Sequence, residues 1–511
     1  MQQVITMSPN KKLFYLISFV EGGIVMGAEL LGAKMLAPFF GSSLYVWATV
    51  LAVTLGGLAG GYFVGGILSY KSKRKNTLFY VLLIASAFTS LMPFISKIIL
   101  QLVNSDMLLF SIVISTTVFL LPPVFLMGMV SPLVIKEVTH NTEEAGKVAG
   151  GIYAISTVGG ILSTFLFGFY IIPTFGLTLP CIFSGIILSI IPIVMLIKKD
   201  KSSVLFMILL FSVCSYKAIK KGTASDIKIL YEKEGLLGQL LVADYPNYDS
   251  KGKIVSYNRM LFSNRICQTY YSKSSDSATY LPYVKKLVSL TEGIPMGSNA
   301  LILGLGGGSI ANELIKKNYQ VDAVELDNRV VLAAKEYFEL NKNVNTYIDD
   351  ARHYIKSCSK KYDVIIFDVF KGEENPTHII TEESMEEVKK ILNKNGKIII
   401  NSNGYWDGEI GLGTQSIAQT ILSSGFQIAI FPTSNEPAQR NILMLASNEA
   451  LPLNDSLLPL ALSLKNMNGI VLKDDFPILD ILNYKANKAW RTGYINNSIA
   501  YFQKSNIPLF N

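Results

Sequence analysis

The N-terminal part of the chain consists of long apolar runs that are separated by short polar segments. Runs of roughly twenty apolar residues can cross a lipid bilayer as helices. The second and fifth runs are rich in glycine, which lets helix backbones pack closely, and Pro122 with Pro123 should kink the fourth run. We therefore expect a multi-pass α-helical membrane domain over residues 1–222, with seven spans near residues 13–39, 44–69, 78–102, 107–134, 147–172, 176–197 and 203–219.

The hydrophobic pattern changes near Asp226, where short alternating runs begin. The runs IKILYEKEG, GQLLVADY, KIVSYNRML and RICQTYY predict a small antiparallel β-sheet within residues 223–290, followed by a helix over roughly Ser277 to Leu290. From ALILGL to KIIINSN, strands then alternate with helices, which is typical of a parallel sheet with crossover helices. We expect an α/β Rossmann-like domain of the class I methyltransferase type over residues 291–511.

The composition supports a division of the chain into a part in the lipid bilayer and a part in water. The chain has 511 residues, of which 50% are hydrophobic and 16% charged, and its mean hydropathy is +0.36. Soluble domains carry about 25% charged residues. The net charge of +8 arises largely from short basic clusters between apolar runs, so nucleic-acid binding is not expected. Four scattered cysteines and three histidines do not have the spacing of a disulfide framework or a metal centre.

The basic clusters also predict an orientation. They place the N-terminus and the loops near 71–76, 135–147 and 198–202 in the cytoplasm. A seventh full crossing would then put the C-terminal half outside. However, the last apolar run is short and Lys217, Lys220 and Lys221 follow it, which disfavours export. We therefore expect the last run to be interfacial or re-entrant, and a protein of the cell membrane whose catalytic domain is cytoplasmic.

Three ionisable residues lie within or near the end of the first span: Glu21, Glu29 and Lys34. Ionisable groups are costly in lipid, so these side chains should face protein or water. They form either a polar lining for a substrate or proton, or an internal Glu29–Lys34 pair that holds helices together. The sequence leaves both readings open.

The segment LILGLGGGSIANELI, residues 301–315, passes from an apolar strand through a glycine turn into a helix. A turn of this kind allows a nucleotide-like ligand to approach the backbone, here at Gly304, Gly306 and Gly308. Tight packing of the strand against the helix is the alternative explanation for the same glycines.

Carboxylates follow the next strands. Glu325 ends the strand after the glycine turn, where it can accept hydrogen bonds from ribose hydroxyls. Asp350, in YIDDAR, ends the third strand and can receive an adenine amino group. Asp368 ends the fourth, in YDVIIFDVF. Three acids at one sheet edge are costly to desolvate without partners, so they predict a site for an adenosyl ligand.

The segment from about Gly235 to Asn403 resembles the polyamine aminopropyltransferases, the spermidine synthase family. The opening spans, LGAKMLAPFFGSSLYVWATVLAVTLGGLAGGYFVGG, and the segment DVFKGEENPTHIIT resemble the membrane-fused branch of that family. The resemblance implies that an aminopropyl group passes from decarboxylated S-adenosylmethionine to an amine such as putrescine, leaving methylthioadenosine. It implies no metal and is compatible with a homodimer.

The resemblance also assigns roles to residues. Asp368 matches the catalytic aspartate, a general base for the attacking amine. Glu325 matches the ribose-binding carboxylate, and Asp350 with Ala351 matches the adenine site. Two further positions align with residues beside the cofactor and the substrate cavity, namely Gln268 and Tyr280. An ordinary strand polar residue and a core aromatic are their alternative interpretations.

Two substrate-site positions depart from the family pattern. Ser309 stands where soluble members have an aspartate that holds the aminopropyl nitrogen. Lys371 replaces a second acid, which should repel a diamine and could instead pair with the carboxylate of intact S-adenosylmethionine. His378 is either a second proton carrier or a structural loop residue, and Asp474 is either a lid residue or, the reading we favour, a solvated turn acid.

Three functions therefore remain open. The leading hypothesis is a membrane-anchored aminopropyltransferase of polyamine biosynthesis. The second is an S-adenosylmethionine-dependent transferase or lyase that acts on another substrate, as Ser309 and Lys371 suggest. The third is a polyamine transporter with a sensor domain, as Glu21 and Glu29 suggest.

Overall fold

A computed structural model describes most of the chain, and its contacts divide the described residues into two compact units. The helical unit extends to residue 219 and includes residues 233–235 and 237–239, and the mixed α/β unit holds the remaining described residues from 226 to 490. The described ranges are 11–41, 44–71, 76–103, 108–139, 141–219, 226–235, 237–272, 281–369, 376–437, 440–451, 461–465 and 467–490.

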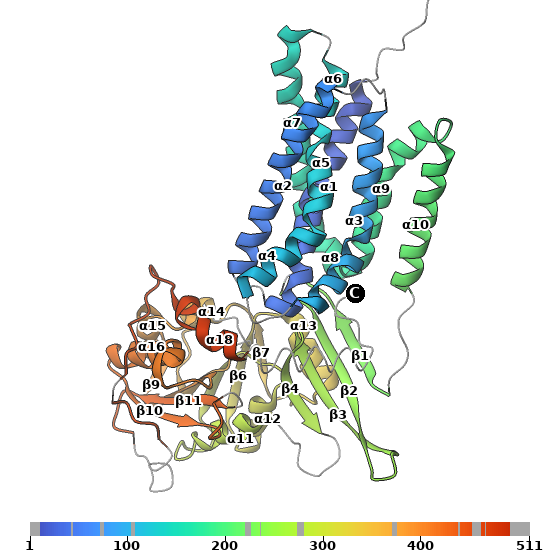
Figure 1. Cartoon of the computed structure of the whole chain (residues 1–511). Coiled ribbons are helices and arrows are strands. Elements are labelled where there is room, and N and C mark those ends of the chain that lie inside the picture. Colours follow the sequence, from blue (N-terminus) through green and yellow to red (C-terminus); the bar gives the residue numbers. More distant parts are fainter. Residues whose placement is uncertain are drawn as a thin grey trace, which may run out of the picture. The chain divides into compact units, whose positions relative to one another are not determined.

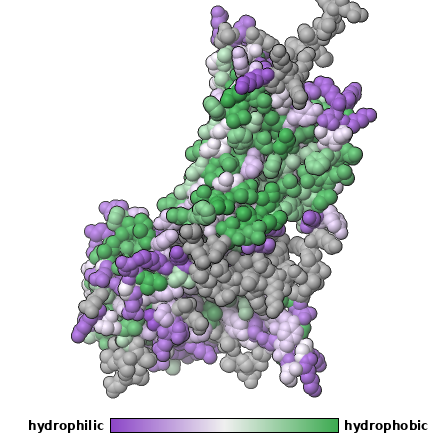
Figure 2. All heavy atoms as spheres, viewed as in Figure 1, coloured by the Kyte–Doolittle hydropathy of each residue, from purple (hydrophilic) through white to green (hydrophobic). Residues whose placement is uncertain are grey.

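The helical unit contains seven described segments that are long and apolar enough to cross a membrane. In the view of Figure 2, hydrophobic side chains cover most of the visible face of this unit. Figure 1 shows its helices, which are α1 (Lys11–Phe40), α2 (Leu44–Lys71), α3 (Thr77–Leu102), α4 (Leu108–Phe119), α5 (Leu121–Gly128), α6 (Val130–Val138), α7 (Ala145–Leu166), α8 (Ile172–Phe175), α9 (Thr178–Leu196) and α10 (Lys201–Ile219). A short 3₁₀ turn, η1 (Thr142–Glu144), precedes α7, and a π-helical turn, η2 (Phe167–Ile171), joins α7 to α8.

The fourth apolar run is interrupted next to Pro122 and Pro123, as predicted, and it forms three helices. The chain breaks at Leu120 and again at Met129, giving α4, α5 and α6. Pro122 and Pro123 lie in the first turn of α5. Because proline has no N–H to donate to the preceding turn, α4 cannot continue through them. The segment long enough to cross is Leu121–Val138, and Leu109–Phe119 is a shorter apolar helix.

The glycines of the helical unit permit the close packing that the sequence predicts. A Cβ on Gly61 would collide with the carbonyl oxygen of Phe125, and one on Gly65 would lie 2.7 Å from the Cα of Met129. Backbones of α2 and of the α5–α6 segment therefore touch at positions where no side chain fits. Glu21 is buried in α1 and accepts a hydrogen bond from the Ser156 hydroxyl at 3.3 Å.

The mixed unit begins with the predicted small sheet, whose strands lie in the order β1-β2-β3-β4. β2 pairs antiparallel with β3, and β3 pairs antiparallel with β4, as predicted. Apolar residues of this sheet, such as Leu240 and Leu261, pack against Val330 and Phe338 of the following domain. The strands are β1 (Lys228–Lys233), β2 (Leu240–Tyr248), β3 (Ile254–Ser263) and β4 (Ile266–Ser272).

A seven-stranded sheet forms the centre of the mixed unit, in the order β10-β11-β9-β8-β5-β6-β7. β5 to β9 are parallel, which confirms the predicted α/β fold. β10 and β11 add an antiparallel hairpin at one edge, which differs from the parallel sheet that the sequence predicts. The strands are β5 (Asn299–Leu303), β6 (Gln320–Glu325), β7 (Asn345–Ile348), β8 (Tyr362–Phe367), β9 (Leu392–Asn403), β10 (Gln427–Pro432) and β11 (Asn441–Ser447).

This strand order fixes where a ligand can bind. β5 lies between β6 and β8. The chain adds β6 and β7 on one side of β5 and then crosses to the other side, where it adds β8 and β9. The switch point is therefore between β5 and β8. In open parallel sheets, ligands bind outside the carboxyl ends of the strands at this switch point. The glycine turn follows β5 and Asp368 follows β8, so both lie at that point.

Both faces of the central strands are buried, as expected for a parallel sheet covered by helices. In β5, Leu301 and Leu303 join the core shared with α14, α15 and α16, whereas Ala300 and Ile302 join the core shared with α11, α12 and α13. The helices are α11 (Pro282–Ser289), α12 (Ser309–Lys316), α13 (Asn328–Tyr337), α14 (Ala351–Ser357), α15 (Glu382–Ile391), α16 (Leu412–Ser423), α17 (Leu479–Leu482) and α18 (Tyr484–Trp490), with 3₁₀ turns η3 (Thr377–Ile379) and η4 (Gly408–Gly411).

A buried polar network supports the amino end of this sheet. Asp322 is 1% exposed and accepts hydrogen bonds from Lys360 Nζ at 2.8 Å, Tyr362 Oη at 2.8 Å and Asn345 Nδ2 at 2.9 Å. Removing the carboxylate leaves the buried Tyr362 hydroxyl and the half-buried Lys360 ammonium without this acceptor. We expect Asp322→Ala to lower the free energy of unfolding by about 3 kcal/mol.

Chemical denaturation of the purified protein measures this change. Lys316→Ala, which removes one partner of the exposed Lys316–Glu313 ion pair, is the matched control and should change stability by less than about 0.5 kcal/mol. Equal effects of the two substitutions would contradict a stabilising role for the network.

Candidate functional site

The glycine turn after β5 packs directly on the end of β8. Gly304 has a φ of +88°, and a Cβ there would collide with the carbonyl oxygen of Asp368. The Asp368 amide in turn donates to the Leu303 carbonyl at 2.8 Å. Glycine is required at position 304 because of both the left-handed backbone and the neighbouring strand.

The other glycines of the turn also meet protein atoms. A Cβ on Gly307 would lie 2.5 Å from the Thr269 side chain, and one on Gly308 would lie 2.5 Å from the Leu340 side chain. Thr269 Oγ1 accepts a hydrogen bond from the Gly307 amide at 2.8 Å, which links the small sheet to the turn. The packing alternative therefore accounts for Gly304, Gly307 and Gly308, and a ligand at the turn stays a prediction.

Asp368 is held by hydrogen bonds to both carboxylate oxygens. Tyr283 Oη donates to Oδ2 at 2.9 Å, and Asn401 Nδ2 donates to Oδ1 at 2.7 Å. Burial is the largest effect and raises the pKa of Asp368 above its usual range. The hydrogen bonds from Asn401 and Tyr283 offset part of this rise, and the Glu325 carboxylate adds to it. An acid with a raised pKa in a fixed orientation is suited to accept a proton.

Tyr283 is the fixed donor of this pair. Burial, followed by the adjacent Asp368 carboxylate, raises the pKa of Tyr283 well above its usual range. The phenol therefore stays protonated and donates its hydrogen bond across the whole physiological pH range.

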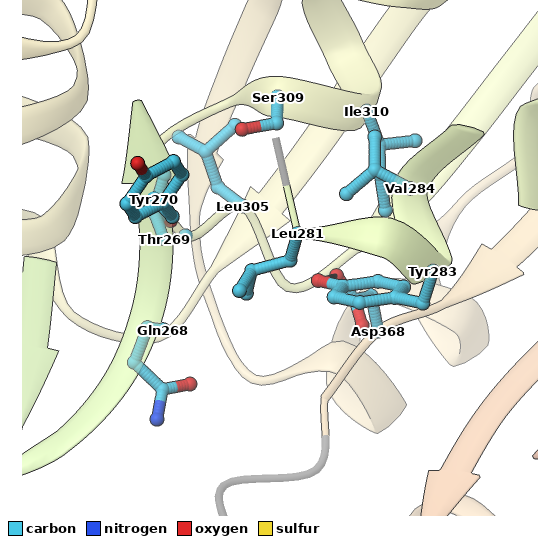
Figure 3. Close-up of a pocket in the computed structure, with 11 residues that line it drawn as sticks. Gln268, Thr269, Tyr270, Leu281, Tyr283, Val284, Leu305, Ser309, Ile310 and Asp368 are labelled. Carbon is cyan, nitrogen blue, oxygen red and sulfur yellow. Dashed lines mark hydrogen bonds between the residues drawn. The ribbon is translucent and has the colours of Figure 1, made fainter. Parts of the chain in front are cut away.

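A small cavity opens beside Asp368. Figure 3 shows Tyr283 and Asp368 on one side of it, Gln268 and Tyr270 on the other, and Ser309 at the start of α12 above. The cavity thus brings together four of the predicted site residues, Gln268, Gly306, Ser309 and Asp368. Its lining consists of Gln268, Thr269, Tyr270, Leu281, Tyr283, Val284, Leu305, Gly306, Ser309, Ile310 and Asp368.

Glu325 lies next to the glycine turn but outside this lining. Its Oε2 accepts a hydrogen bond from the Leu305 amide at 3.1 Å, and its Oε1 accepts one from the Asp327 amide at 3.0 Å. The side chain is 7% exposed. Through these hydrogen bonds, Glu325 stabilises the conformation of the turn after β5.

Asp350 and Ala351 begin α14 and also lie outside the cavity lining. Asp350 caps the helix by accepting the Arg352 and His353 amides, and its Oδ2 lies 3.2 Å from His378 Nε2. Burial raises its pKa, but the His353 amide and the His378 side chain outweigh this, so the pKa lies below its ordinary value. Ala351 is buried in the core. His378 thus makes a hydrogen bond to Asp350 and does not line the cavity.

Asp474 lies in a turn and its side chain is 43% exposed, which agrees with the favoured interpretation of a solvated turn acid, but the side chain also has partners. It pairs with Arg352 at 3.1 Å and accepts a hydrogen bond from the Thr381 hydroxyl at 2.7 Å. Arg352 also pairs with Glu387 of α15 and donates to the His378 carbonyl. The network ties α14, α15 and the C-terminal segment together behind the site.

Two predicted substrate residues, Tyr280 and Lys371, lie outside the described residues. Three contributing residues were missed: Tyr283, Asn401 and Thr269. Asn401 could have been found, since it lies at the end of β9 on the same sheet edge as the carboxylates. Among the residues that the structure describes, no group of three or more His, Cys, Asp or Glu side chains is placed to hold a metal ion.

Comparison with known proteins gives one family match. Residues 286–436 match the family model described as the spermine/spermidine synthase domain. A polyamine aminopropyltransferase of Vibrio vulnificus is 30% identical over 181 residues, which is 34% of this chain and 59% of that protein. An N-terminal histidine N-methyltransferase of Emericella nidulans is 34% identical over 156 residues, which is 29% of this chain and 26% of that protein.

Among solved structures, a probable spermidine synthase from Corynebacterium glutamicum aligns with 18% sequence identity and a TM-score of 0.36. The alignment covers 50% of this chain and 89% of that chain. The chain thus spans 59% of the length of the Vibrio relative and 26% of the Emericella relative.

Proposed function

We propose that the protein is a membrane-anchored aminopropyltransferase, because residues 286–436 match the spermine/spermidine synthase domain. It would transfer an aminopropyl group from decarboxylated S-adenosylmethionine to an amine and release methylthioadenosine. The observation that carries the proposal is Asp368, a carboxylate with a raised pKa that two donors orient into a cavity at the switch point of the sheet.

The residues present fit an adenosyl donor. Glu325 lies at the end of β6, where its carboxylate would accept hydrogen bonds from the ribose hydroxyls, and Asp350 would receive the adenine amino group. Gly306, Ser309 and Gln268 line the cavity beside the turn and would contact the reacting end. When bound, the donor would supply the electrophile, which is the methylene carbon next to the sulfonium.

The chemical role of this chain is then proton transfer and positioning. Asp368 takes a proton from the acceptor amine as the nitrogen attacks the methylene carbon. A nitrogen–carbon bond forms, the carbon–sulfur bond breaks, and the sulfur keeps the bonding electron pair. Tyr283 and Asn401 keep the Asp368 carboxylate in one orientation, so that its proton-accepting oxygen faces the amine.

The direct test supplies the purified full-length protein with decarboxylated S-adenosylmethionine and a panel of amines. We expect release of methylthioadenosine together with an aminopropylated amine, measured by liquid chromatography and mass spectrometry. Binding of the donor without release of methylthioadenosine with any amine would contradict the proposal.

A second candidate is methyl transfer from intact S-adenosylmethionine. It is favoured by the 34% identity to the N-terminal histidine N-methyltransferase and by the neutral Ser309 in the cavity lining. Mass spectrometry of the small molecule that copurifies with the protein distinguishes the two. Methylthioadenosine or the decarboxylated donor supports the leading function, and S-adenosylhomocysteine or the intact donor supports methyl transfer.

The membrane location is part of the proposal. Seven apolar helical segments of the described chain have the length of a span, and the basic clusters predict that the catalytic domain is cytoplasmic. Protease digestion of right-side-out and inverted membrane vesicles tests this. We expect cleavage of the domain only in the inverted vesicles.

Tyr283→Phe tests how Asp368 is tuned. The phenol donates to the charged form of Asp368, so its loss should raise the pKa of that carboxyl further. Because the base must be deprotonated, the acidic limb of the pH profile of kcat/KM should move to higher pH by about one unit.

Tyr270→Phe is the matched control, because Tyr270 lines the same cavity from β4. The acidic limb of the pH profile of kcat/KM in this variant should lie at the same pH as in the unmodified protein. An unshifted profile in Tyr283→Phe would show that the hydrogen bond does not tune the base.

A further inference from the structure

The Asn401 side chain lies between Asp368 and the edge hairpin of the sheet. Its Nδ2 donates to Asp368 Oδ1 at 2.7 Å, and its Oδ1 accepts a hydrogen bond from Asn441 Nδ2 at 2.9 Å. Asn401 is 6% exposed, so its amide has protein partners at both ends and little access to water. These two hydrogen bonds connect the Asp368 carboxylate to the first residue of β11.

The antiparallel direction of β11 places Asn441 at this edge of the sheet. β11 begins where β9 ends, and Asn441 pairs with Asn403, two positions after Asn401. Because side chains alternate between the two faces of a sheet, Asn441 and Asn401 are diagonal neighbours on one face. A parallel strand in the same place would begin at the opposite edge, away from Asp368.

The backbone of Asn441 is held by the residue that follows β10. The Asn441 amide donates to Thr433 Oγ1 at 2.8 Å, and the Asn441 carbonyl oxygen accepts from the Thr433 amide at 2.9 Å. The hairpin therefore fixes the start of β11 and keeps the Asn441 side chain within reach of Asn401.

The direction of the Asn401 amide matters for Asp368. An ionised carboxylate can only accept hydrogen bonds, so the amide must present its nitrogen to it. A protonated Asp368 can also donate, and an amide turned by 180° would accept that hydrogen through its oxygen and stabilise the protonated acid. However, the Asn401 oxygen is bound to Asn441. A turned Asn401 amide would set two NH2 groups against each other unless Asn441 turned with it, so the pair resists the change.

We propose that Asn441 is a positioning residue that acts through Asn401. It holds the Asn401 amide with its nitrogen toward Asp368, and so keeps the carboxylate in the form that accepts a proton from the amine. The inference rests on the proposed function for the role of Asp368 as the base. Asn441 is not among the described residues that line the cavity, so it contributes orientation and not contact with the substrate.

Asn441→Leu tests the inference, because it removes the donor and nearly keeps the side-chain volume. The turned amide then becomes available to protonated Asp368, so the acidic limb of the pH profile of kcat/KM should move to higher pH by about half a unit. The described titratable groups that act on Asp368 are Tyr283 of α11 and Glu325 of β6, and both are unchanged in this variant. Asn441→Ala should shift the limb in the same direction, and it replaces the leucine variant if leucine disturbs the hairpin.

A double-mutant cycle shows whether Asn441 acts through Asn401. Asn401→Ala removes the direct donor to Asp368, and in that background Asn441→Leu should cause no further shift of the acidic limb. Ser447→Ala is the matched control, since it removes the hydrogen bond from Ser447 Oγ to the Gly396 carbonyl at 3.2 Å, at the other end of β11. This control should leave the limb in place. An equal shift from Asn441→Leu with and without Asn401, or the same shift in Ser447→Ala, would overturn the inference.

Infrared spectroscopy separates this inference from the proposed function. The carbonyl band of protonated Asp368, identified by its loss in Asp368→Asn, can be titrated in the full-length protein without turnover. A band that titrates at higher pH in Asn441→Leu, with no methylthioadenosine released with any amine, would support the positioning role and contradict the proposed reaction. Release of methylthioadenosine, with the limb and the band of Asn441→Leu unshifted, would support the reaction and overturn the positioning role.

Discussion

Asp368→Asn is expected to reduce the rate of methylthioadenosine release by about a thousandfold, because it removes the proton acceptor. The asparagine can keep both neighbours, since its oxygen can accept from Asn401 Nδ2 and its amide can donate to Tyr283 Oη. Binding of methylthioadenosine, measured by calorimetry, should change little. Retention of more than a tenth of the activity would show that Asp368 is not the base.

The same substitution should raise thermal stability. Burial raises the pKa of Asp368 in the folded protein, so this group favours folding below its unfolded pKa and loses that contribution as pH rises through the folded pKa. At neutral pH the buried carboxylate therefore destabilises the fold, and a neutral amide does not. We expect a higher Tm for Asp368→Asn at pH 7 and a smaller difference at pH 4. An equal or lower Tm at pH 7 would contradict this.

Gly304→Ala is expected to cause the largest loss of stability, about 4 kcal/mol in the free energy of unfolding. The alanine would have to adopt a φ of +88° and its Cβ would collide with the backbone carbonyl oxygen of Asp368, directly after the neighbouring strand β8. Chemical denaturation followed by circular dichroism measures the change.

Gly252→Ala separates the two causes. Gly252 has a φ of +74°, and a Cβ there meets nothing within 4 Å. This control therefore has the backbone strain without the collision and should lose only about 1 kcal/mol. Similar losses at both positions would show that β8 does not constrain the glycine turn.

The alternation of strands and helices after Asp226 was sufficient to predict the fold of the mixed unit. Apolar runs bounded by turn residues identified β1 to β9, and the rule that ligands bind at the carboxyl ends of strands identified the edge that holds Asp368. The antiparallel hairpin of β10 and β11 was not predicted, because its direction depends on which edge of the sheet remains free.

The site was predicted less completely, because side-chain partners come from distant segments. Tyr283 precedes Asp368 by 85 residues and Asn401 follows it by 33, and local patterns do not record such contacts. Asp474 is a further residue whose partner comes from a distant segment of the chain. It lies in a polar turn by sequence, yet it pairs with Arg352, 122 residues earlier.

The glycine turn shows that one pattern can have two physical causes. A glycine turn of this kind can leave room for a ligand, but the backbone at Gly304, Gly307 and Gly308 packs against Asp368, Thr269 and Leu340. Close packing explains the same glycines, and the structure shows that packing. The glycines are therefore explained by packing. A binding measurement tests whether a ligand also contacts the open side of the turn.

The most direct measurement is a structure of the full-length protein with methylthioadenosine bound, determined by cryo-electron microscopy. Our proposal predicts the sulfur of the ligand beside the cavity lined by Asp368 and Ser309, with the ribose hydroxyls at Glu325. Ligand density away from the carboxyl ends of β5 and β8, for example among the helices α1 to α10, would contradict it.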